Sequence, residues 1–226
     1  MTDVRITLHD VVLEGTVTGA GPTVLLLHAG GEHRGVWVPV ASRIAAAGFR
    51  TVAFDLRGHG DSTGEANVLR ALADDVVEMV RCEPAPLVVV GASVGGLAAV
   101  AALAESDIAH RVAGLILVDV VPESDPARVR AWLSEAGLRD QRTDLVEDSL
   151  AAGPELHATA VAAQVPILLV RGETSSLTDA EVDRFLADRP VSVVCVPDAG
   201  HLVAREAPEE LARIISEQAD FWLVTA

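Results

Sequence analysis

The sequence contains no lysine, so apart from histidine all its basic residues are arginine. Without lysine the chain cannot form a Schiff base with a carbonyl substrate or bind phosphate through a P-loop, which excludes two large enzyme classes. Its net charge of −16 also disfavours nucleic acid as a partner, because that binding depends on neutralising phosphates with basic side chains. We expect a small-molecule substrate and no nucleic-acid partner.

Cysteine is scarce, and secretory and membrane signals are not visible. Cys82 and Cys195 lie in unrelated contexts, which indicates neither a disulfide framework nor a metal cluster, and we expect two buried, inert thiols and no metal or cofactor. The beginning, MTDVRITLHD, lacks a basic stretch followed by an apolar core, and no apolar run has spanning length. We therefore expect a cytoplasmic location and no membrane association.

Short apolar runs alternate with helical patterns along most of the chain. Two β-like segments open the chain. The short apolar runs that follow them are typical of strands covered on both faces of a parallel sheet. These runs are 23–28, 51–55, 86–91, 114–119, 166–171 and 191–196. Helical periodicity lies between them, as in 36–47 and 69–80. The order predicts a single α/β domain over residues 1–226, built on a doubly wound sheet.

One insertion departs from this alternation. Residues 121–164 carry three short helical patterns, punctuated by prolines, between two expected strands. We interpret the insertion as a small helical lid. Beyond the next strand, Thr178 and Glu181 have the spacing of a capping box at the start of a helix.

The first chemical motif is Gly91-Ala92-Ser93-Val94-Gly95-Gly96, which follows an expected strand and precedes an alanine-rich helix. A serine between glycines in this context predicts a nucleophile elbow, a sharp and strained turn in which side chains at the glycine positions would clash. The helix begins beside the serine, so its free N–H groups and dipole face the same point. We expect Ser93 to be a catalytic nucleophile.

Two further loops follow strands and meet the same edge of such a sheet. His28-Ala29-Gly30-Gly31 is a glycine-rich turn, and we expect the N–H groups of Gly30 and Val94 to form an oxyanion hole. His201 follows the last expected strand, and with an ordinary pKa near 6.5 it suits a general base at neutral pH. For His28 and His59, which lie in turns near the site, we favour a structural role.

The motifs LLLHAGGE, FDLRGHGDS, VVVGASVGG, GLILVDVVP, PILLVRG and PDAGH resemble, in order and spacing, those of the α/β-hydrolase superfamily over essentially the whole chain. The resemblance implies the α/β-hydrolase fold: a mostly parallel eight-stranded sheet with antiparallel first strands, helices on both faces and a small helical lid. It also implies that Ser93 and His201 belong to a catalytic triad.

The chain departs from this family at the third member of the triad. The family's acid usually follows the seventh strand, and Ser176 occupies the corresponding position. Asp119, at the end of the sixth expected strand, is our first candidate because some family members, including haloalkane dehalogenases, place their acid there. Glu123 and Glu173 lie within a short loop of the same edge and are also candidates.

With a serine nucleophile, the expected reaction is hydrolysis of a carboxylic ester, thioester or lactone through an acyl-enzyme at Ser93, with His201 as general base. Trp37 and Trp132 are candidates for binding a small, largely apolar substrate, with packing in the core as the alternative. Two alternatives remain open. One is a non-hydrolytic or carbon–carbon bond-cleaving enzyme on the same scaffold, and the other is a binding protein with a degraded triad.

Overall fold

The computed structural model describes residues 1–137 and 143–225. At its centre is an eight-stranded sheet with the order β1-β2-β4-β3-β5-β6-β7-β8. Its strands are β1 (Thr2–Thr7), β2 (Val12–Gly19), β3 (Thr23–Leu27), β4 (Arg50–Phe54), β5 (Leu87–Ala92), β6 (Val112–Val118), β7 (Ile167–Gly172) and β8 (Ser192–Val196). β2 runs antiparallel to β1 and β4, and the other neighbours are parallel. The predicted fold class is confirmed.

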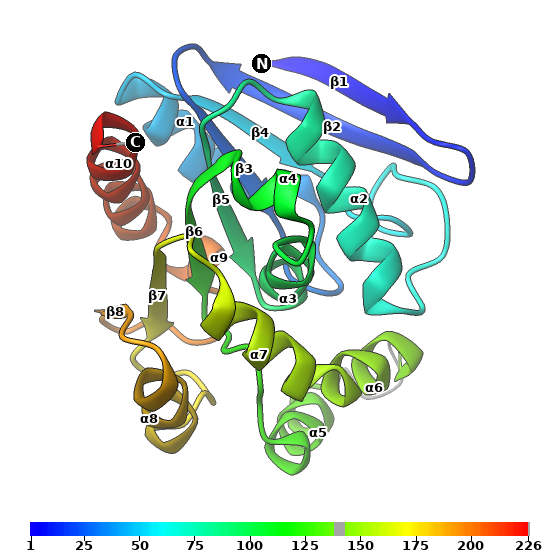
Figure 1. Cartoon of the computed structure of the whole chain (residues 1–226), viewed down its shortest axis with the longest axis vertical. Coiled ribbons are helices and arrows are strands. Elements are labelled where there is room, and N and C mark those ends of the chain that lie inside the picture. Colours follow the sequence, from blue (N-terminus) through cyan, green and yellow to red (C-terminus); the bar gives the residue numbers. More distant parts are fainter. Residues whose placement is uncertain (138–142, 226) are drawn as a thin grey trace.

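Helices cover both faces of this sheet (Figure 1). They are the 3₁₀ helix η1 (Arg34–Trp37), α1 (Val38–Ala46), α2 (Leu69–Cys82), α3 (Val94–Ala102), α4 (Ser106–Ala109), α5 (Pro126–Glu135), α6 (Thr143–Ala151), α7 (Gly153–Ala162), α8 (Asp179–Asp188), α9 (Val203–Glu206) and α10 (Pro208–Thr225). α1 packs against α10, and α2 packs against α3.

The alternation of side chains along the strands divides the core into two hydrophobic clusters. Val24 and Leu26 of β3 pack with residues of α1 and α10. Leu25 and Leu27 of the same strand pack with residues of α2 and α3. Successive side chains in a strand point to opposite faces, so a strand that is buried on both faces is apolar throughout. This explains why the central strands read as continuous apolar runs in the sequence.

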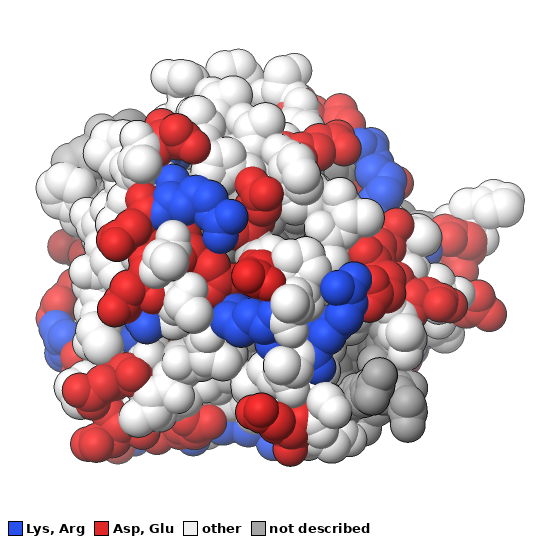
Figure 2. All heavy atoms as spheres, turned by 90° about the horizontal axis from the view of Figure 1, so that it is seen from below, with Lys and Arg blue, Asp and Glu red and all other residues white. Residues whose placement is uncertain are grey.

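Three helices, α5 to α7, lie between β6 and β7, as expected for the insertion at 121–164, of which 138–142 fall outside the described residues. In Figure 1 they lie at the bottom of the molecule, away from the β1–β2 hairpin. Figure 2, seen from that end, shows basic side chains interleaved with acidic ones, with no continuous basic surface on this face. No helix within the described ranges is both long and apolar enough to cross a membrane.

The predicted capping box is confirmed at the beginning of α8. The Thr178 hydroxyl accepts a hydrogen bond from the Glu181 N–H, and the Glu181 carboxylate accepts one from the Thr178 N–H. The expectation for the two cysteines is wrong, because both Cys82 and Cys195 are exposed free thiols. Cys82 is the last residue of α2, and Cys195 lies in β8, a strand at the edge of the sheet.

Candidate active site

Ser93 lies between β5 and α3 with φ 48° and ψ −120°, a backbone conformation that is strained for any residue with a side chain. The flanking glycines make this turn sterically feasible. A Cβ atom on Gly91 would lie 2.5 Å from the Gly96 Cα, and one on Gly95 would lie 2.7 Å from the carbonyl oxygen of His28. The glycines at these two positions are therefore required by the close approach of neighbouring backbone.

The two residues expected to form an oxyanion hole lie beside this turn. Gly30 follows β3, and a Cβ atom built on it would be 3.7 Å from the Val94 Cγ1. Val94 is the first residue of α3, and the first N–H groups of a helix have no acceptor within it. Gly30, Val94 and Ser93 line one cavity. The loop after β3 and the beginning of α3 therefore meet beside the serine at the cavity.

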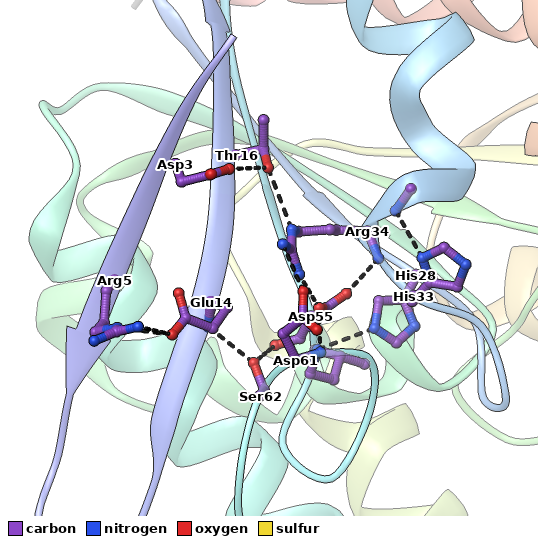
Figure 3. A network of polar contacts seen from close by, with 12 residues as sticks. Asp3, Arg5, Glu14, Thr16, His28, His33, Arg34, Asp55, Asp61 and Ser62 are labelled. Carbon is purple, nitrogen blue, oxygen red and sulfur yellow. Dashed lines mark hydrogen bonds and ion pairs between the residues drawn. The ribbon is translucent and has the colours of Figure 1, made fainter.

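A polar network anchors the loop that contains Gly30 (Figure 3). The Arg34 N–H donates to the Asp55 Oδ1 at 2.6 Å, and the Arg34 guanidinium forms ion pairs with Asp55 and with Asp61, the latter at 2.9 Å. The Asp55 side chain is fully buried, so these charge-assisted bonds are shielded from water. They fix the end of the β3 loop against the turn that follows β4.

His28 makes a second connection between these two loops. Its Nε2 accepts a hydrogen bond from the Leu56 N–H at 3.0 Å, so the proton is on Nδ1, which donates to the Ala29 carbonyl at 2.8 Å. Burial is the main cause that lowers the pKa of His28 from 6.5 to about 4. The ring of His59 lies 5.0 Å from that of His28. His28 is a neutral, buried side chain whose contacts are structural.

His201 lies in the loop after β8, and its Nδ1 is 2.8 Å from the Asp119 Oδ2. The backbone of this loop packs against the end of β7, where a Cβ atom on Gly172 would be 2.2 Å from the Gly200 carbonyl oxygen. The Trp132 ring contacts the His201 imidazole at a centroid distance of 4.5 Å. His201 therefore has one ring nitrogen at a carboxylate and an apolar neighbour on α5.

Asp119 directly follows β6 and adopts a left-handed φ of 54°. Its carboxylate is fully buried and accepts hydrogen bonds from three groups: the Gly172 N–H at 2.9 Å, the Ser175 hydroxyl and His201. Hydrogen bonds of this kind satisfy a buried carboxylate and fix its orientation. Asp119 is thus rigidly held with one oxygen toward the histidine.

The other positions considered for the acid have different partners. The Ser176 hydroxyl accepts a hydrogen bond from the Arg128 Nη1 at 3.0 Å. Glu173 is exposed and accepts a hydrogen bond from the Asp198 N–H at 3.0 Å. The Glu123 side chain lies against Gly153 at the beginning of α7. In the described ranges, the carboxylate that the structure places at His201 is that of Asp119.

A cavity of about 460 Å³ contains Ser93, Asp119 and His201 in its lining. Most of the remaining lining is apolar and comes from the β6–β7 insertion and the loops around it, including Val120, Val129, Trp132, Leu133, Leu145, Val146, Leu150, Leu177 and Leu202. Trp132 lies in this lining, as expected. Trp37 does not line this cavity, and its side chain is wholly buried among core residues near α1 and α10.

Comparison with known proteins assigns the chain to a family. A family model described as "alpha/beta hydrolase fold" matches residues 22–143. The chain belongs to the α/β-hydrolase family. The family match covers more than half of the chain, including the β3 loop, the Ser93 turn and Asp119.

Several relatives are hydrolases or esterases. The 2-(acetamidomethylene)succinate hydrolase of Mesorhizobium japonicum is 27% identical over 96% of this chain and 94% of its own length. Protein phosphatase methylesterase 1 of Bos taurus is 38% identical, but over 45% of this chain and only 28% of the bovine protein. Among solved structures, a thermophilic esterase from Thermogutta terrifontis has a TM-score of 0.73 and 26% identity, covering 98% of this chain and 99% of its own. These relatives are named as hydrolases or esterases, and the chain is similar to two of them over nearly its whole length.

Proposed function

We propose that this protein is a serine hydrolase that cleaves a carboxylic ester, thioester or lactone through an acyl-enzyme at Ser93. His201 acts as general base and Asp119 as the acid of the triad. The observation that carries the proposal is the 2.8 Å contact between His201 Nδ1 and Asp119, in a cavity that Ser93 also lines. The strained turn around Ser93 and the neighbouring backbone donors support it.

The reaction follows from the arrangement of the ring nitrogens. Because His201 Nδ1 donates its proton to Asp119, its Nε2 carries the free electron pair that accepts the Ser93 hydroxyl proton. The serine oxygen attacks the substrate carbonyl, and the N–H groups of Gly30 and Val94 stabilise the resulting oxyanion. The imidazolium then gives its proton to the leaving alcohol or thiol. Water, deprotonated by His201, then attacks the acyl-enzyme, and the imidazolium returns this proton to the Ser93 oxygen as the acid is released.

The cavity favours a small substrate with a largely apolar acyl group. Its apolar lining stabilises hydrocarbon by removing it from water, at about 25 cal/mol per Å² buried. Relatives named as esterases, such as the bovine methylesterase and the Thermogutta terrifontis enzyme, support ester chemistry. A binding protein with a degraded triad is disfavoured, because Asp119 retains hydrogen bonds that orient it toward His201.

A serine-directed fluorophosphonate tests this proposal. We expect the intact protein to gain the mass of one phosphonyl group, located on Ser93 by peptide mapping, and Ser93→Ala to remain unlabelled. The exposed Ser134→Ala variant serves as a matched control and should be labelled like the unaltered protein. An unlabelled protein, or a label on another residue, would contradict the proposal.

A further inference from the structure

The cavity wall formed by α6 contains one polar side chain. Leu145, Val146, Ser149 and Leu150 of this helix line the cavity, and their spacing places them on one helical face. The serine is the exception on a surface that is otherwise apolar. It lies in the insertion, on a different element from Ser93 and His201.

The Ser149 hydroxyl is buried and has no hydrogen-bond partner within the part of the chain that the structure describes, and the residue is only 7% exposed. Two serines in other helices of this protein behave differently. The Ser42 hydroxyl donates to the Val38 carbonyl at 2.8 Å, and the Ser216 hydroxyl donates to the Ala212 carbonyl at 2.8 Å. Such i−4 bonds are the usual solution for a serine inside a helix.

Leaving a buried hydroxyl without a partner is unfavourable, and alanine would fill the same site without that cost. We propose that Ser149 determines specificity by hydrogen-bonding a neutral polar atom in the acyl group of the substrate, a ketone, ether or hydroxyl oxygen. This inference rests on the proposed function, because it extends the acyl site of the same enzyme. Rotation about the Cα–Cβ bond redirects the hydroxyl toward a bound ligand.

The surroundings favour a neutral group over a carboxylate. A charge buried against Leu145, Val146 and Leu150 would lack a counter-ion from this wall, and an unpaired charge in apolar surroundings is strongly disfavoured. Arg128 also lines the cavity, but its guanidinium already bonds Glu181 and Ser176. A serine hydroxyl, which donates one hydrogen bond and can also accept, matches a neutral oxygen.

The experiment compares p-nitrophenyl hexanoate with p-nitrophenyl 4-oxohexanoate and 5-oxohexanoate, which move one carbonyl along a chain of constant length. We expect Ser149→Ala to lower kcat/KM for at least one oxo ester by about 10-fold and to leave the hydrocarbon ester within about 2-fold. Ser134→Ala, the same substitution on an exposed residue of α5, should change none of these values. Equal effects of Ser149→Ala on all three esters, or no effect on any, would overturn the proposal.

A binding measurement separates this proposal from the proposed function. The anilides of hexanoic and the two oxohexanoic acids are titrated calorimetrically into Ser93→Ala and into Ser93→Ala/Ser149→Ala. We expect the second substitution to weaken binding of at least one oxo anilide about 10-fold and to spare the hexanoic anilide. If this weaker binding were found in a protein that hydrolyses no ester, only the proposed function would be refuted, and the role of Ser149 in binding would stand. Indistinguishable affinities in the two variants would remove the role of Ser149.

Discussion

At the scale of single residues, the site depends on a carboxylate that follows β6 and lies beside the loop after β7. Asp119 reaches His201 while the Gly172 N–H and the Ser175 hydroxyl hold it from the β7 side. Ser176, at the position where the acid is usual in the family, bonds Arg128 of the insertion. Two neighbouring residues of one loop therefore have different roles: Ser175 supports the acid, and Ser176 contacts α5.

Substitution of the acid tests this division. Asp119→Asn should reduce kcat on an ester substrate by about 10⁴-fold, because an amide no longer stabilises the imidazolium or the required tautomer. Asparagine tolerates the left-handed backbone at this position, so the fold is preserved. Ser176→Ala should change kcat by less than about 3-fold. Steady-state kinetics on both variants measures the difference, and the opposite ranking would remove Asp119 from the triad.

His28 gives a prediction about pH. Its pKa of about 4 in the folded chain lies below the value near 6.5 of an unfolded histidine, so the unfolded chain binds more protons between these values. The contribution of neutral His28 to stability is therefore complete above pH 6.5 and is lost as the pH falls toward 4, by about 3 kcal/mol.

Urea unfolding of the unaltered protein and of His28→Gln at several pH values measures this contribution. Glutamine keeps an acceptor for the Leu56 N–H but does not titrate. As the pH falls from 7 to 4, the unfolding free energy of the unaltered protein should decrease relative to that of the variant. A difference that stays constant over this range would show that His28 is not held neutral by the fold.

The sequence indicated that the candidate residues would lie close together because their motifs follow strands, and the carboxyl ends of parallel strands meet at one edge; the structure places Ser93, Asp119 and His201 in the lining of one cavity. It left Asp119, Glu123 and Glu173 as alternatives, because all three lie near that edge and only the direction of each side chain distinguishes them. The direction of the side chain also separates Trp132, which lines the cavity, from Trp37, which packs in the core. The sequence alone does not distinguish an aromatic residue that packs in the core from one that lines the cavity.

At the scale of elements, the Glu181 carboxylate connects α8 to the beginning of α5. It accepts hydrogen bonds from the Asp125 N–H at 2.8 Å and from the N–H and hydroxyl of Thr178, and it pairs with Arg128. Burial alone would raise the pKa of Glu181, but these hydrogen bonds and the arginine outweigh it and lower the pKa. The sequence predicted the capping box, whereas its connection to α5 depends on tertiary contact.

Two ion pairs of α5 offer a comparison. Glu181→Ala removes a buried carboxylate and leaves the half-buried Arg128 without it, so we expect a loss of roughly 3 kcal/mol in unfolding free energy. Glu147→Ala removes the exposed partner of Arg130 and should lower the unfolding free energy much less, because water screens an exposed ion pair. Urea denaturation of both variants measures the two losses. Equal losses would show that Glu181 does not anchor α5.

At the scale of the whole molecule, the fold assembles the site from segments that are far apart in the chain. Strand order places the ends of β3, β5 and β6 side by side, and α5 and α6 complete the cavity above them. The alternation of strands and helices predicted a doubly wound sheet, and the resemblance to the α/β-hydrolase superfamily implied its eight strands and antiparallel first strands. The shape of the cavity was not predictable, because it depends on how the insertion packs on the sheet.

The most direct test of the account is detection of the acyl-enzyme. Rapid mixing with p-nitrophenyl hexanoate should release a burst of about one p-nitrophenolate per active site, and acid quenching should trap one hexanoyl group on the peptide that contains Ser93. Ser93→Ala should show neither the burst nor the acyl group. Turnover that persists in Ser93→Ala, or an acyl group on a different residue, would contradict the account.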